Sequence, residues 1–335
     1  MMEQSAKLPI PNTLSTPLKS LLVRWETFLL AVFAAVFIAF SVTSPYFLNV
    51  WNLSDATFNF TERALIALPM AMLIICREID LSVASIIALA SVAMGYVAQT
   101  GADVPLIVLT GITVGLLCGL FNGFVVTTFG IPSIVVTIGT MSLFRGITQG
   151  LMGNQVLRDY PFEFAFFGQG YVYWVFSFQF VLFLSCALLF YILLHRTNFG
   201  RRTYAIGNNP TAAEFSGIKV RRHKMILFAM VGVMAGVASV LLTSRLGSTR
   251  PAIAFGWELS IVTMVVLGGV NILGGSGTIP GVVIAAFLMG VVTFGLGLMN
   301  IPGIVMNIII GLMLITVISI PVIMRRIQQH RSRHL

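Results

Sequence analysis

Charged side chains interrupt or border long apolar runs at two places in the sequence. Arg77, Glu78 and Asp80 break one apolar stretch and are followed by Ser82. A charge near the bilayer centre costs about 2.5–3.5 kcal/mol on insertion scales, so such residues mark a functional site or have polar partners. The alternative is an ordinary turn in which Asp80 or Ser82 caps the next helix. Arg145 lies deeper in another run and either snorkels, pairs with an acid or lines a pathway.

Glycine occurs in two patterns with different meanings. Gly111, Gly115, Gly119 and Gly123 recur at every fourth position, which places them on one helix face and predicts close packing against another helix. The run 267–281 contains too many glycines for a stable helix interior, at about 1 kcal/mol each. We expect a break there, which is either a cytoplasmic turn or a re-entrant element at a pathway.

A polar, basic stretch, residues 195–224, separates two apolar parts of the chain. Within it Asn209 precedes a proline, and Gly217 ends the segment. This pattern predicts a short helix capped by Asn209, with Ala212 and Ala213 as small residues on its surface. Such a helix suits docking into a partner's groove, and the alternative is an amphipathic connector.

Several kinds of chemistry have no residues to support them. The chain has no G-x-x-x-x-G-K-[ST] motif, so it contains no phosphate-binding loop and does not hydrolyse ATP by itself. Its 4 histidines lie outside the apolar runs, and its 3 cysteines lie singly within them. Neither pattern predicts a haem, a zinc site or a disulfide. We therefore predict a transport subunit without catalytic residues, metal or cofactor.

Lipid must be the main solvent of this chain. Of its 335 residues, 57% are hydrophobic and 9% charged, with a mean hydropathy of +0.96, whereas soluble domains carry about 25% charged residues. The apolar runs are long and continuous, which favours helices over a β-barrel. We predict an all-α, polytopic membrane protein with ten spans, which are Trp25 to Ser44, Asn59 to Cys76, Leu81 to Gln99, Pro105 to Thr127, Ser133 to Met152, Tyr171 to Leu194, Met225 to Thr243, Trp257 to Gly274, Ile279 to Met299 and Pro302 to Ile323.

The basic residues are sorted to one side of this predicted bundle. The N-terminal segment 1–24, the loop 195–224 and the tail 325–335 hold most of the 20 lysines and arginines. The positive-inside rule therefore places these three segments, and both termini, in the cytoplasm. The transmembrane domain is predicted to cover residues 25–324. A net charge of +9 reflects this sorting and does not indicate nucleic-acid binding.

Four motifs resemble, in order and spacing, those of a known family. Residues 79–83 read IDLSV, 139–146 read GTMSLFRG, 200–218 read GRRTYAIGNNPTAAEFSGI, and 256–277 run from GWEL to GGSG. These are similar to motifs in the permease subunits of bacterial ABC importers for ribose, xylose, arabinose, rhamnose and autoinducer-2. The family usually has two glycines where this chain has Arg77 and Glu78, and this variant more closely resembles the rhamnose and autoinducer-2 branches.

The resemblance implies a set of partners in the bacterial inner membrane. Two permeases, identical or different, would form the pore among membrane lipid, a separate cytoplasmic ABC ATPase would power it, and a periplasmic sugar-binding protein would deliver the solute. The segment that couples the ATPase to the spans would comprise Asn209, Ala212, Ala213, Glu214, Ser216 and Gly217.

Polar residues of the spans are candidates for the translocation pathway. These are Asp80, Asn122, Thr137, Arg145, Thr263 and Asn271. They are too generic to identify the sugar. The leading hypothesis is the permease of an ATP-driven sugar importer. The alternatives are an ion-coupled secondary transporter, which needs ionisable groups near the midplane, and a membrane scaffold that transports nothing.

Overall fold

The computed structural model describes residues 25–306, 308–309, 311–312, 315 and 319. The predicted N-terminal segment 1–24, the tail 325–335 and half of the tenth span lie outside these residues. The elements are α2 (Trp25–Thr43), α3 (Val50–Phe58), α4 (Thr61–Ile75), α5 (Val83–Gln99), α6 (Val104–Phe129), α7 (Ser133–Met152), η1 (Phe162–Phe164), α8 (Ala165–Gln169), β1 (Tyr171–Tyr173), β2 (Phe176–Ser177), α9 (Phe178–Arg196), α10 (Asn198–Asn208), α11 (Pro210–Phe215), α12 (Val220–Leu246), α13 (Trp257–Leu267) and α14 (Ile279–Leu298). The all-α class is confirmed, with one antiparallel hairpin, β1–β2, in addition.

Six of these helices are long and apolar enough to cross a membrane. They are α2, α6, α7, α9, α12 and α14, and α3 with α4 would make a seventh as one span bent by 52°. Helices α5 and α13 are apolar but shorter. A multi-pass helical architecture is therefore confirmed, and the number of ten spans stays a prediction.

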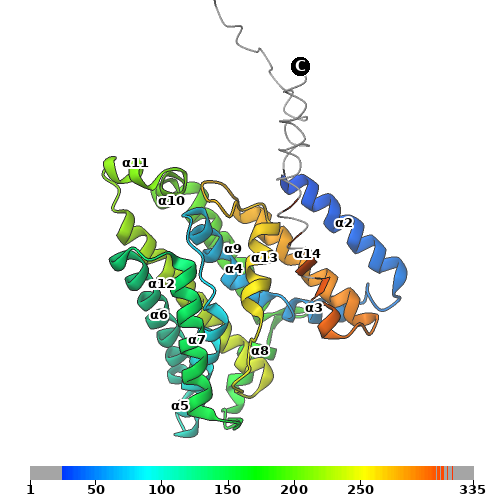
Figure 1. Cartoon of the computed structure of the whole chain (residues 1–335). Helices are drawn as coiled ribbons and strands as arrows, with labels where there is room; N and C mark the ends of the chain where they lie inside the picture. The colour runs from blue at the N-terminus through cyan, green and yellow to red at the C-terminus, as the bar shows by residue number, and fades with distance from the viewer. Residues whose placement is uncertain (1–24, 307, 310, 313–314, 316–318, 320–335) are drawn as a thin grey trace, which may run out of the picture.

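Helix α4 forms the centre of the molecule (Figure 1). All of its residues except Arg63 are buried, as expected for a helix that is apolar on every side. Helices α9, α12, α13 and α14 pack against it, α5 and α6 pack against α12, α7 packs against α5 and α6, and α2 packs on α14. The core of the protein thus runs along α4 and the inner faces of its neighbours.

The predicted glycine face of α6 is the face that this helix turns to α12. A Cβ atom at Gly115 would lie 2.4 Å from the carbonyl oxygen of Gly232, and one at Gly232 would lie 2.3 Å from that of Gly115. At Gly119 the nearest atom, a carbonyl oxygen of α12, would also lie at 2.4 Å. The two backbones are in direct contact because no side chain stands between them.

Two predicted spans are wrong at one end. The span expected from Tyr171 begins at Phe178, because the residues before it form the β1–β2 hairpin with Trp174 at a φ of 44°. Aromatic and β-branched residues favour strands as readily as helices. The span expected to reach Gly274 ends at Leu267, where the glycine-rich run begins.

One break was not predicted. Helix α3 precedes α4, and the two meet at a bend of 52° around Asn59. No span was predicted between Thr243 and Trp257, and residues 247–256 form turns and one bridge between Thr249 and Leu157 before α13 begins at Trp257 (Figure 1). The predicted span from Trp257 is helical in its first part only, as far as Leu267.

Candidate functional site

Three segments that connect the long helices meet at one end of the bundle. They are the turn 76–82, the loop 195–224, which contains α10 and α11, and the glycine-rich run 268–278. Arg77 joins the first two. Its Nε donates to the carbonyl oxygen of Gly207 at 2.6 Å, and its Nη2 donates to that of Asn208 at 2.8 Å. These are the last carbonyl groups of α10, and the helix dipole favours a cation at that end of a helix. Arg77 itself has a φ of 65°, in the region that favours glycine.

The glycine-rich run packs onto the same end. The amide of Gly275 donates to the carbonyl oxygen of Ile75 at 2.9 Å, and the hydroxyl of Tyr204 donates to that of Gly277 at 2.6 Å. Burial raises the pKa of Tyr204 to about 12, so the phenol keeps its proton and remains a donor. The turn 76–82 and the glycine-rich run therefore both pack against the loop 195–224.

A charge pair ties the turn to α12. Glu78 forms an ion pair with Lys224, which lies in the first turns of that helix. Beside it, the hydroxyl of Thr203 lies 2.9 Å from Nε2 of His223. The two residues that replace the family's usual glycines, Arg77 and Glu78, therefore both hold the turn against the loop and its following helix.

Three predicted pathway residues come together behind this turn. Asp80 accepts from the amide and hydroxyl of Ser82 at 2.8 and 2.6 Å and from the side-chain amide of Asn122 at 3.1 Å. Thr137 donates to the carbonyl oxygen of Ile79 at 3.3 Å. Asp80, Asn122 and Thr137 are all completely buried, so this network fixes the joint between α5, α6 and α7.

The other three lie apart from that network. Arg145 donates to the carbonyl oxygens of Pro251 at 3.0 Å, Ile253 at 2.9 Å and Ala84 at 3.2 Å. Among the described residues its hydrogen-bond partners are thus backbone carbonyls of the irregular segment 247–256 and of α5, and it forms no ion pair with an acid.

Thr263 and Asn271 make local hydrogen bonds. Thr263 donates to the carbonyl oxygen of Leu259 at 2.7 Å within α13. Asn271 accepts from the amide of Leu273 at 3.0 Å within the glycine-rich turn. Neither contact brings these residues to the network of Asp80 or to Arg145.

The structure reveals a charged group that the sequence analysis missed. Glu62, at the start of α4, is buried and accepts from Arg245 in a two-bond geometry at 2.8 and 3.0 Å. The neighbouring Arg63 points elsewhere, with its guanidinium 4.6 Å from the ring centre of Trp257. The signal was present as two adjacent charges inside the predicted span Asn59 to Cys76.

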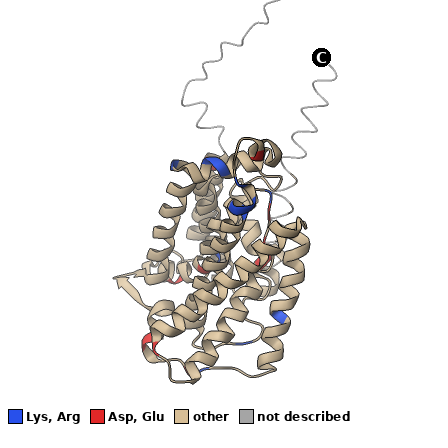
Figure 2. Ribbon diagram, turned by 90° about the vertical axis from the view of Figure 1, so that its left-hand side faces the viewer, with Lys and Arg blue, Asp and Glu red and all other residues tan. Residues whose placement is uncertain are grey.

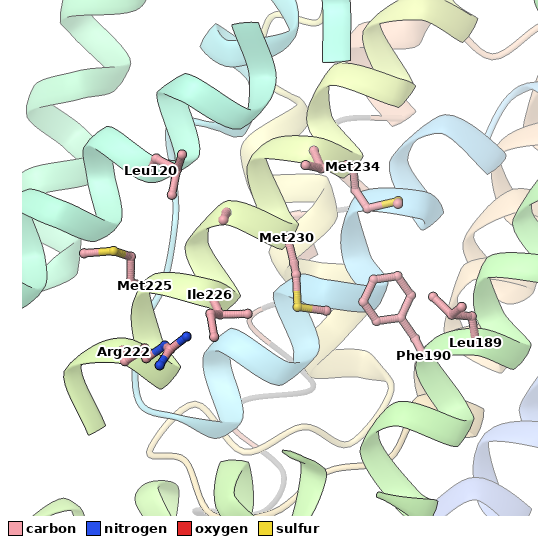
Figure 3. A pocket seen from close by; sticks show the side chains of 10 residues that line it. Leu120, Leu189, Phe190, Arg222, Met225, Ile226, Met230 and Met234 are labelled. Carbon is pink, nitrogen blue, oxygen red and sulfur yellow. The ribbon is translucent and has the colours of Figure 1, made fainter. Parts of the chain in front are cut away.

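Arg63 and Trp257 border a polar cavity of about 530 Å³. Its lining comes from α4, α13, α14 and the breaks beside them, and comprises Asn59, Arg63, Phe255, Gly256, Trp257, Ser260, Thr293, Phe294, Gly297, Leu298, Gly303 and Met306. A second cavity of about 430 Å³ lies between α6, α9 and α12 (Figure 3). Aliphatic and methionine side chains line it, with Arg222 at one end, so it offers a polar solute almost no hydrogen bonds.

Helix α11 projects at the basic end of the bundle. The predicted cap is confirmed, since the side chain of Asn209 accepts from the amide of Ala212 at 3.1 Å and Pro210 begins the helix. Ala213 is wrong as a surface residue, because it is 5% exposed and faces the protein interior. Phe215 was not singled out, yet it is 90% exposed.

The surface around α11 is exposed and mostly basic. Glu214, Ser216 and Gly217 are exposed on it, and so are Arg201, Arg202, Arg221 and Arg222. Figure 2 shows Lys and Arg gathered at this end of the bundle.

A multi-pass helical bundle with broken helices beside a polar cavity has the architecture of a membrane transport protein. Residues 52–318 match the family model described as the branched-chain amino acid transport system / permease component. The chain belongs to this family of ABC importer permeases, which confirms the resemblance found in the motifs. It is a multi-pass protein of the inner membrane and is not an enzyme, since the ATPase of such importers is a separate chain.

Similar proteins are permeases along nearly their whole length. The autoinducer 2 import system permease protein LsrD of Escherichia coli (strain K12) is 35% identical over 92% of this chain and 94% of its own. The protein of the same name from Shigella flexneri has the same identity and coverage, and that from Escherichia coli O157:H7 is 34% identical. None of the solved structures matched the chain.

Proposed function

We propose that this chain is the permease subunit of an ATP-driven importer for a small, hydroxyl-rich solute, either a monosaccharide or autoinducer 2. The observation that carries the proposal is the 35% identity over 92% of the chain to a permease named for autoinducer 2 import. That name supports autoinducer 2 over rhamnose, the two branches that the motif variant with Arg77 and Glu78 resembles.

The proposed topology has ten spans with both termini in the cytoplasm. The transmembrane domain covers residues 25–324, between the cytoplasmic segment 1–24 and the tail 325–335, and the loop 195–224 is cytoplasmic. The gathering of Lys and Arg beside α10 and α11 supports this orientation (Figure 2), because basic residues are retained on the cytoplasmic side.

A cytoplasmic ATPase is the proposed partner of α11. Phe215 is the apolar anchor, and Ala212, Glu214, Ser216 and Gly217 are the exposed residues around it. A second permease, identical or related, would complete the pore, and a periplasmic binding protein would deliver the solute from the other side.

The route from ATPase to spans follows the contacts at the basic end. Movement of α11 pulls on α10, whose last carbonyls are held by Arg77 at the end of α4. The same loop continues into α12 at Lys224, which is paired with Glu78. Closure of the ATPase would therefore act directly on the two helices that pack at the centre of the bundle.

Phe215→Asp tests this assignment, and Phe162→Asp is its control. The two phenylalanines are equally exposed, at 90% and 91%, but Phe162 lies in η1, far from α11 in the sequence and outside the loop 195–224. We expect Phe215→Asp to abolish copurification of the ATPase and ATP-driven uptake into proteoliposomes, with normal membrane insertion. Glu214→Arg should weaken both.

Two results would contradict the proposal. Normal ATP-driven uptake by Phe215→Asp would remove α11 from the coupling interface. Uptake that survives ATP depletion and collapses with an uncoupler would instead establish ion-coupled transport.

A further inference from the structure

We propose that Arg63 and Trp257 form a binding subsite for a neutral, polyhydroxylated solute in the polar cavity beside α4, α13 and α14. The inference rests on the proposed transport function and names residues that would contact the solute within the membrane domain. Trp257 lies in the GWEL motif and Arg63 in none of the four motifs, and neither is among the pathway residues predicted from the sequence.

The first argument is that Arg63 carries a charge that nothing nearby neutralises directly. Glu62 is the carboxylate beside it, and both of its oxygens accept from Arg245. Successive residues on a helix point about 100° apart, so Arg63 faces away from that pair. Within the described part of the chain the Arg63 guanidinium donates to no acceptor, and its Nε is buried without a partner.

An arginine whose guanidinium has no hydrogen-bond acceptor within the described residues needs an acceptor from outside the chain. Buried polar atoms in native proteins almost always have a hydrogen-bond partner, and the exceptions call for a functional explanation. The guanidinium lies over the Trp257 ring at 4.6 Å, and this contact holds it in place without using its N–H donors. Those donors therefore stay available at the edge of the cavity.

The second argument is the mixture of groups in the lining. Asn59 has no side-chain hydrogen bond to the described residues, so its amide offers both a donor and an acceptor. Ser260 and Thr293 donate to carbonyl oxygens of their own helices at 2.9 Å, which leaves their oxygens as acceptors. A hydroxyl group both donates and accepts, so this lining suits a polyol better than an anion, which can only accept.

The third argument is where the helices break. The bend between α3 and α4 occurs at Asn59, and the irregular segment 247–256 ends at Trp257, so both breaks reach the same cavity. Irregular backbone at membrane depth is tolerated where it is buried in protein or lines a cavity, and transporter sites are built at such breaks. The volume of about 530 Å³ falls within the range of about 300–1,000 Å³ for small-molecule sites.

Fluorescence of Trp257 tests the cavity without transport. The other three tryptophans are replaced by phenylalanine in the full-length permease, in nanodiscs, and Trp257 is quenched by iodide and by acrylamide. We expect Arg63→Gln to reduce iodide quenching at least two-fold and to leave acrylamide quenching unchanged, because only the anion senses the charge. Equal iodide quenching with and without Arg63 would overturn the proposal.

Transport kinetics then test solute binding, with autoinducer 2 and L-rhamnose as probes in proteoliposomes that contain the complete importer. We expect Arg63→Gln and Trp257→Leu to raise KM about ten-fold or more, as for loss of a charge-assisted hydrogen bond, with ATP hydrolysis retained. Arg63→Lys and Trp257→Phe should recover part of the affinity. Trp174→Leu, at an exposed tryptophan outside the cavity, is the matched control.

The outcomes separate this inference from the proposed function. An unchanged KM in Arg63→Gln and Trp257→Leu, while Phe215→Asp stops uptake, would overturn the subsite and leave the permease assignment intact. If the wild-type importer takes up neither probe with ATP, the solute assignment in the proposed function is wrong. The iodide comparison then decides whether the cavity holds the uncompensated cation.

Discussion

Arg77 donates a hydrogen bond of 2.6 Å to the carbonyl oxygen of Gly207, a residue 130 positions later in the sequence. The bond joins the end of the central helix α4 to the end of α10. Gly207 is needed for this approach, because a Cβ atom there would lie 1.9 Å from the carbonyl oxygen of Ile75. The loop 195–224 is thereby attached to the core of the bundle and not only to its neighbours in sequence.

Arg77→Gly should loosen this attachment. Glycine accepts the φ of 65° without strain, so the variant removes the two hydrogen bonds and leaves the backbone undisturbed. We expect the free energy that holds the loop 195–224 against the bundle to fall by about 1 kcal/mol. Trypsin should then cleave this loop faster, and ATP hydrolysis should be poorly coupled to uptake. Limited proteolysis and the ratio of solute imported to ATP hydrolysed measure these effects. Arg158→Gln, at an exposed arginine outside this loop, should change neither.

Gly115→Ala should destabilise the α6–α12 pair. The new methyl group would lie 2.4 Å from the carbonyl oxygen of Gly232, and backbone atoms move aside only if the helices separate. Overpacking of this kind costs about 1–3 kcal/mol. The midpoint of thermal unfolding in detergent should therefore fall.

Gly146→Ala in α7 is the matched control for Gly115→Ala. A Cβ atom at Gly146 would meet nothing within 4 Å, so alanine brings only its higher helix propensity, at most about 1 kcal/mol. A midpoint that is equal to or above that of the wild type is expected. An equal fall in both variants would show that glycine is needed for some reason other than helix contact.

Glu62→Gln should be among the most damaging single substitutions in the chain. It leaves the guanidinium group of Arg245 without the carboxylate that pairs with it, and removal of one partner of a buried ion pair costs about 3–5 kcal/mol. We expect little folded protein in fluorescence-detected size exclusion. The double variant Glu62→Gln with Arg245→Met removes one cation as well and should recover part of the folded yield. No recovery would mean that the charge balance is not what Glu62 supplies.

Much of this architecture follows from composition and local pattern. Continuous apolar runs predict helices in lipid, the four-residue glycine spacing predicts the face that α6 turns to α12, and Asn209 followed by Pro210 predicts the start of α11. Each of these rests on interactions within one or two helical turns. The basic loop was recognised for the same reason, since charge sorting is a property of the linear sequence.

Features that depend on packing were not predictable in this way. The segment 171–177 is as apolar as a span, and its hairpin depends on the turn at Trp174. Ala213 and Phe215 both lie on a short helix, and only the packing of α11 decides that the first is buried and the second exposed. Arg63 was overlooked because its surrounding run is apolar, and its role depends on Trp257, which is distant in the sequence.

Arg145→Met tests what holds the irregular segment 247–256 in place. Methionine has a similar length but no donor, so the carbonyl oxygens of Pro251, Ile253 and Ala84 lose the guanidinium that binds them. Unsatisfied buried groups cost about 1–3 kcal/mol, and the midpoint of thermal unfolding should fall accordingly. A cysteine introduced at Ala252 should become more reactive towards a maleimide, because residues 247–256 are no longer held against α5 and α7.

Arg145→Lys separates charge from geometry at this position. Lysine keeps the positive charge but carries its three donors on one compact nitrogen, whereas the planar guanidinium reaches three separate carbonyls at once. If the geometry holds the segment, lysine should recover less than half of the lost stability and leave the cysteine reactive. If lysine restores both measurements completely, the positive charge alone is sufficient, and the three hydrogen bonds of Arg145 do not set the path of the chain into α13.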